Sequence, residues 1–225
     1  MALTGPKREP SRSANRRRFQ RSFVRHVHSI LARGYSRLDA RAFVQREEED
    51  ITGEITRSMQ AVVQDQGAPG WAKYYWPAEE TRVHEHGRLG KRRLRIDIEI
   101  MRHGIETRPR FRFEAKRLHD AASRREYLGN EGLGRFLDGR YAVDDEVAGM
   151  LGYVQDGSVD MQGQGLAALI KSRPKEYAVR KGWGWAKFTI VPGLSTFRSG
   201  HQRANLPPIT LFHTMLLFCG PRVAD

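Results

Sequence analysis

The chain has 225 residues, of which 39% are hydrophobic and 29% are charged. This size favours one domain with its own core, and the composition excludes a chain that is disordered throughout. A single cysteine excludes an intrachain disulfide framework and a multi-cysteine zinc site. With no membrane-length apolar run and no apolar signal core, we expect a cytoplasmic protein without membrane association. The net charge of +13 indicates a polyanionic partner, most often nucleic acid.

The first 18 residues are strongly basic. Arg16, Arg17 and Arg18 form the densest charge there, and large apolar side chains are almost absent. We therefore predict a disordered basic arm over residues 1–18, followed by a single folded domain over residues 19–225. Such an arm either contacts nucleic-acid phosphates through its arginines or serves as a solubility tail.

The remaining chain shows alternating helical and strand patterns. Apolar residues at helical spacing predict helices over residues 19–34, 38–66, 120–128 and 159–171. Period-two alternation and apolar runs predict extended segments over residues 81–86, 94–100, 111–116, 147–154, 183–191 and 209–218. Residues 67–80 read as an aromatic loop. The order predicts an α/β (α+β) fold in which helices flank a mixed central sheet.

Polar side chains gather on one face of two neighbouring predicted strands. Asp97 alternates with isoleucines in the first strand, and Glu114 and Lys116 share one face of the next. If the strands pair as a hairpin, the three side chains converge, and two adjacent carboxylates then require a divalent cation. A lysine beside them would reach a metal-bound water or a phosphate oxygen. The alternative is a solvated face stabilised by cross-strand charge pairs.

The segments Ile96-Asp97-Ile98 and Phe113-Glu114-Ala115-Lys116 resemble the PD-(D/E)xK nuclease superfamily, although no proline precedes Asp97. The resemblance extends over residues 38–128. It implies a restriction-endonuclease-like core, in which a helix precedes a three-stranded meander, and a further helix and strand follow. Many members also use a glutamate on the first helix. We prefer Glu48, which shares the core-facing stripe of that helix, and keep Glu54 as the second choice.

The resemblance also implies roles for these residues. Asp97, Glu114 and the Ala115 carbonyl would bind Mg²⁺, for which Mn²⁺ can substitute. Lys116 would orient or activate the attacking water, and Glu48 would support the metal or the water. The implied function is metal-dependent hydrolysis of phosphodiester bonds in nucleic acid, with DNA favoured and a role such as bacterial defence against foreign DNA.

No helix-turn-helix and no P-loop is found in the sequence, so we expect dependence on a homodimer or on a separate helicase or recognition subunit. The alternative function is a catalytically idle nucleic-acid-binding or adaptor subunit of a larger complex.

A second basic segment lies over residues 197–203, before the last predicted strand. Its composition predicts phosphate contacts, and an ordinary charged loop is the alternative. The candidate contact residues are Arg198, Ser199, His201 and Arg203.

Overall fold

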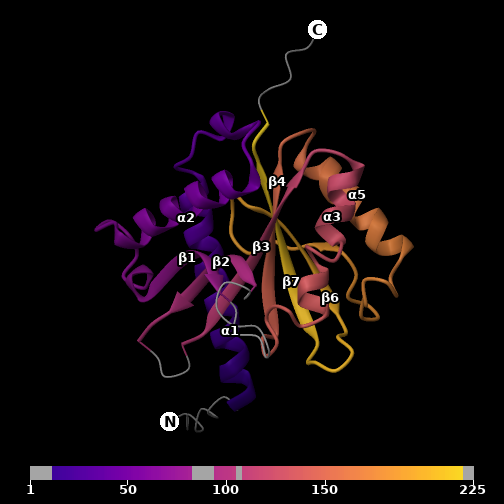
Figure 1. Ribbon diagram of the computed structural model, residues 1–225. Coiled ribbons are helices and arrows are strands. Elements are labelled where there is room, and N and C mark those ends of the chain that lie inside the picture. Colours follow the sequence, from indigo (N-terminus) through magenta and orange to yellow (C-terminus); the bar gives the residue numbers. More distant parts are fainter. Residues whose placement is uncertain (1–11, 83–93, 105–107, 220–225) are drawn as a thin grey trace, which may run out of the picture.

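The computed structural model describes residues 12–82, 94–104 and 108–219. They form a seven-stranded mixed sheet with helices on both faces, as the sequence predicted (Figure 1). The helical elements are α1 (Arg12–Tyr35), η1 (Ala40–Phe43), α2 (Glu48–Gln64), η2 (Ala72–Tyr74), α3 (Ala121–Leu128), α4 (Gly134–Leu137) and α5 (Val159–Ser172). The strands are β1 (Tyr75–Arg82), β2 (Arg95–Arg102), β3 (Arg110–Leu118), β4 (Val147–Val154), β5 (Ala186–Lys187), β6 (Ser195–His201) and β7 (Ile209–Leu217).

The strand order in the sheet is β1-β2-β3-β4-β7-β6-β5. The first three strands form an antiparallel meander, β3, β4 and β7 run parallel, and β6 and β5 return antiparallel at the other edge. The central strand β4 is buried along almost its whole length. This is the expected result where helices cover both faces of a parallel pair, and it explains the continuous apolar run in the sequence.

Two hydrophobic clusters hold the helices on the sheet. On one face, α1 and α2 contribute side chains such as Val27 and Ile55, which pack against Phe113. On the other face, α3, α4 and α5 contribute residues such as Leu166, which packs with Met150 of β4. Because side chains alternate along β3 and β4, both strands supply residues to both clusters.

The predicted disorder of the basic arm is wrong for residues 12–18, which belong to α1. The Arg16 guanidinium lies 2.8 Å from Glu146 Oε1, and Gln20 donates to the other oxygen of the same carboxylate. Arginine is a good helix former, so the packed part of α1 extends readily into a polar first turn. Residues 1–11 lie outside the described part of the chain.

Several predicted boundaries also differ from the structure. Residues 38–66 are interrupted, because η1 precedes a new helix that starts only at Glu48. Residues 75–80, predicted as loop, lie in β1, and the strand predicted over 183–191 is reduced to β5. Strand β6 was not predicted, because its residues are largely polar, and these polar residues are buried and bonded to one another. Of the strand predicted over 81–86, only residues 81–82 are described.

His28 joins α1 to the sheet without any exposed surface. Its Nδ1 lies 2.8 Å from the Val24 carbonyl oxygen, and its ring meets Phe111 and Phe113 edge to face. Burial lowers the pKa of His28 to about 4. The folded state therefore favours the neutral ring, and this contribution to stability is present above pH 6.5 and lost as the pH falls towards 4.

We expect His28→Leu to reduce the acid sensitivity of the protein. In the parent chain, His28 becomes protonated at pH 5 only when the chain unfolds. The free energy of unfolding should therefore be about 2 kcal/mol lower at pH 5 than at pH 7.5. Urea denaturation of both proteins at the two pH values measures the difference. His119→Leu is the matched control, because that histidine is exposed. A His28→Leu protein with the full pH dependence of the parent would contradict the assignment.

Candidate active site

The site lies where β2 and β3 separate. Their pairing ends at Ile98 and Phe113, and continuing the register by one residue sets Asp97 opposite Glu114. Instead of a strand partner, the backbone N–H of Ala115 donates to Asp97 Oδ2 at 2.7 Å. Burial, which outweighs this hydrogen bond, raises the pKa of Asp97 above its usual range. Beyond Ile98 and Phe113, β2 and β3 are thus no longer paired through their backbones, and the carboxylate of Asp97 lies between them.

Glu114 is completely buried at this point. Its Oε1 lies 2.9 Å from Arg135 Nη1 and 3.4 Å from Lys116 Nζ. Neither contact has hydrogen-bond geometry, so the two cations pair with Glu114 without donating a hydrogen bond to it. The side chain of Glu114 also interacts with Asp97, and this interaction lowers the pKa of Asp97. Burial and then the neighbouring Asp97 raise the pKa of Glu114 to about 9. The ionised form of such a buried carboxyl is costly even beside two cations, and it favours an additional cation or a proton.

Lys116 is held between two carboxylates. Its Nζ lies 2.6 Å from Glu48 Oε1, and the other oxygen of Glu48 accepts from the backbone N–H of Arg117. Burial by itself would lower the pKa of Lys116, but Glu114 and Glu48 together raise it above its ordinary value. The lysine therefore stays charged at neutral pH.

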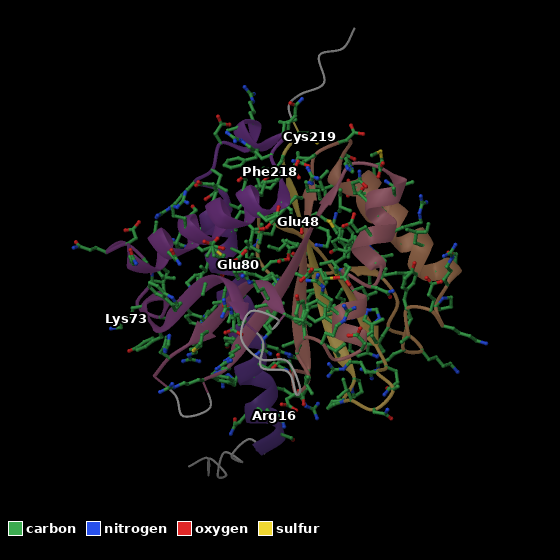
Figure 2. The ribbon with its side chains drawn as sticks, viewed as in Figure 1. Arg16, Glu48, Lys73, Glu80, Phe218 and Cys219 are labelled. Carbon is green, nitrogen blue, oxygen red and sulfur yellow. The ribbon has the colours of Figure 1, made fainter. Side chains whose placement is uncertain are left out.

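The structure brings Glu48, and not Glu54, to the site. Glu48 is the first residue of α2 and lies over the middle of the sheet (Figure 2). Burial raises the pKa of Glu48 above its usual range, in opposition to Lys116, which lowers it. Glu54 instead forms an ion pair with Arg57 on the exposed side of the same helix. Beside the site, a cavity of about 170 Å³ is lined by Glu48, Glu49, Thr52, Glu79, Glu80 and Asp97.

Arg135 adds a second cation to the site, and it was not among the predicted site residues. Its guanidinium contacts Tyr141 Oη and Glu131 in addition to Glu114. The preceding turn is tight, because a Cβ at Gly132 would collide with the carbonyl of Tyr127. The need for glycine at position 132 indicates a tight turn before α4, and this turn brings α4 and Arg135 to the site. A glycine-rich turn is the feature of the sequence from which the position of α4 could have been predicted.

Three of the four predicted phosphate contacts in the second basic segment are wrong, because their side chains are buried. Ser199 and His201 lie inside the sheet, where Ser199 Oγ is 2.6 Å from His201 Nε2 and 2.7 Å from His213 Nε2. Arg203 donates to backbone carbonyls of the 142–145 segment and of Pro207. Arg198 alone remains partly exposed. Composition could not reveal this, because the polar groups satisfy one another.

The donor set fits a hard divalent cation. The carboxylates of Asp97 and Glu114 supply the oxygen ligands that Mg²⁺ prefers. The Ala115 carbonyl points to the same side of β3 as its N–H, which bonds Asp97. Across residues 12–82, 94–104 and 108–219, no group of three or more His, Cys, Asp or Glu side chains is arranged around a metal position. The expected site needs only two carboxylates and a carbonyl.

Comparisons with protein families, with curated proteins and with solved structures find no match for this chain. Within its described part, none of the helices has the length and apolar character that crossing a membrane requires.

The raised pKa of Glu114 predicts a specific pH dependence of stability. The folded state favours the protonated carboxyl, so stability that is present below pH 4.5 is lost as the pH rises towards 9. In metal-free buffer, Glu114→Gln should be more stable than the parent at pH 8, by on the order of 2 kcal/mol, and similar to it near pH 5. Urea denaturation in EDTA measures both values.

The matched control is Glu131→Gln, which alters another carboxylate on the same arginine. Hydrogen bonds from Arg135 and Arg140 lower the pKa of Glu131 to about 2, so its contribution is lost as the pH falls. This variant should show no gain of stability at pH 8. Equal effects of the two substitutions would show that the buried carboxylate of Glu114 carries no special cost.

Proposed function

We propose that this protein is a Mg²⁺-dependent nuclease that hydrolyses phosphodiester bonds of nucleic acid, with DNA favoured. The observation that carries the proposal is the meeting of Asp97, Glu114 and Lys116 where β2 leaves β3. An ordinary hairpin with a solvated charged face would leave these groups exposed, whereas Glu114 and Lys116 are buried. Burial of like charges without full pairing is typical of functional sites.

The order of elements supports a restriction-endonuclease-like core. Helix α2 precedes the β1-β2-β3 meander, α3 follows, and β4 adds in parallel beside β3. This is the order that the sequence resemblance to PD-(D/E)xK nucleases implies. The remaining strands, β5, β6 and β7, extend the sheet beyond that core.

Asp97, Glu114 and the Ala115 carbonyl would hold the Mg²⁺ ion, and Mn²⁺ can substitute for it. The cation supplies Lewis acidity at the phosphoryl group and makes a nucleophilic water available at neutral pH. Lys116, which stays protonated, orients that water or stabilises negative charge on the scissile phosphate. Glu48 fixes the position of the lysine through their 2.6 Å ion pair.

Basic residues away from this site would contact the nucleic-acid backbone. Arg17 and Arg18 are exposed on α1. Arg16, on the same helix, lies well below Glu48 in the view of Figure 2. These charges therefore support binding rather than chemistry. The partner in this proposal is a second copy of the chain or a separate helicase or recognition subunit, and the setting is defence against foreign DNA in the cytoplasm.

The catalytic assignment predicts distinct effects for the three strand residues. Asp97→Ala and Glu114→Ala should weaken Mn²⁺ binding and reduce hydrolysis by about 10²–10³-fold or more, because each removes a ligand. Lys116→Ala should retain metal binding but lose turnover to a similar extent. Calorimetric titration with Mn²⁺ and cleavage of plasmid, linear duplex, single-stranded DNA and RNA measure these effects.

The same assay tests the alternative function. Binding of nucleic acid without hydrolysis in any divalent metal would favour the catalytically idle subunit. Full cleavage by purified Asp97→Ala would show that the active site lies elsewhere.

The helix glutamate can be tested against its own neighbour. Glu48→Gln should lower the turnover number by about tenfold or more, since it removes a charge-assisted hydrogen bond that holds Lys116. Glu49→Gln and Glu54→Gln should have little effect, because neither contacts the lysine. Steady-state kinetics with saturating Mg²⁺ compare the three. A larger loss in Glu54→Gln than in Glu48→Gln is the outcome that this geometry forbids.

A further inference from the structure

A second feature lies at the β5 edge of the sheet and includes Arg198, a predicted phosphate contact. Its other residues, Trp183 and Arg180, were not predicted from the sequence. Trp183 is 37% exposed, and two guanidinium groups lie over its ring. The Cζ atom of Arg180 is 4.9 Å from the ring centroid, and that of Arg198 is 5.1 Å from it. Arg198 also lies 4.7 Å from the ring centroid of Phe188. The neighbouring Trp185 differs, because it packs inward on Phe197 and His213.

Backbone hydrogen bonds fix this arrangement to β6. The N–H of Trp183 donates to the Arg180 carbonyl across a tight turn in which Gly182 has a φ of +78°. Arg180 donates to the Gly200 carbonyl, and Gly200 donates back to the Trp183 carbonyl. A Cβ at Gly200 would approach Trp183 Cβ to 2.8 Å, so the close contact requires glycine there. The exposed indole and its arginines are thus held by the fold rather than by a free loop.

The electrostatic surroundings of Trp183 are strongly positive. Residues 171–187 contain one acidic residue, Glu176, and it pairs with Arg173. The basic residues of this region are Lys171, Arg173, Lys175, Arg180, Lys181, Lys187 and Arg198. Within the described part of the chain, neither Arg180 nor Arg198 forms an ion pair with a carboxylate. Two positive groups beside one exposed ring favour an anionic ligand at this place.

We propose that Trp183, Arg180 and Arg198, with Lys181 and Lys187 beside them, form a binding surface for the phosphodiester backbone of nucleic acid. Guanidinium groups bind phosphate with two donors at once, and their stacking on the indole orders them before the ligand arrives. The exposed part of Trp183 offers a contact for an unpaired base. That the bound nucleic acid is also the substrate rests on the proposed function. Binding at this surface itself requires no hydrolysis.

The test measures DNA and RNA binding in EDTA, where no cleavage takes place. The double variant Arg180→Gln/Arg198→Gln should lower the slope of log affinity against log salt by about 1.8 on duplex DNA, or about 1.4 on a single strand. Trp183→Ala should weaken binding by about fivefold or more, with the larger loss on single strands. Arg37→Gln/Arg57→Gln removes the same net charge from exposed arginines elsewhere and should change the slope less.

The outcomes separate this surface from the active site. Unchanged affinity and salt slope in the Arg180→Gln/Arg198→Gln variant, with its thermal unfolding intact, would overturn the proposal. Displacement of DNA by polyglutamate at equal charge concentration would also overturn it, since the surface would then recognise acidic polypeptide. If the parent chain binds but cleaves nothing in Mg²⁺, the proposed function fails while the binding comparison still decides the role of this surface.

Discussion

The buried carboxylate of Glu114 is the constraint on which the site depends. A fully desolvated acid beside a second acid is unfavourable, and the fold surrounds it with Lys116 from the same strand and Arg135 from a glycine-rich turn. Neither cation makes a true hydrogen bond to it. The site therefore holds three carboxylates, of Glu48, Asp97 and Glu114, against the two cations Lys116 and Arg135. This excess of carboxylates favours a further cation or a proton.

The architecture explains how such a group is tolerated. Strand β3 lies in the middle of the sheet, with an antiparallel neighbour on one side and a parallel neighbour on the other. Its apolar residues pack on α1 and α2, so the strand stays in place although β2 leaves it near Asp97. Stability supplied by the two hydrophobic clusters thus offsets the electrostatic cost concentrated at one point.

Several exposed arginines lie away from the carboxylates around Glu114. One group of arginines lies on helix α1. Another, Arg180 and Arg198, lies beside Trp183 near the edge strand β5. A long polyanion can span such separated contacts, whereas a small anionic ligand cannot. The buried Arg203 is a useful contrast, because its donors are all spent on backbone carbonyls of the same chain. Net charge therefore overstates the surface that is open to a partner.

The sequence by itself determined the elements with strong periodicity and the residues that belong to them. Alternation in β2 and β3 predicted that Glu114 and Lys116 share a face, and the stripe on α2 predicted Glu48 over Glu54. Only the tertiary structure decided the rest. Arg135 reaches the site through a turn, Ser199 and His201 are buried by mutual hydrogen bonds, and residues 12–18 are helical. Periodicity reports burial of apolar side chains, whereas these outcomes depend on long-range polar contacts that leave no regular spacing in the chain.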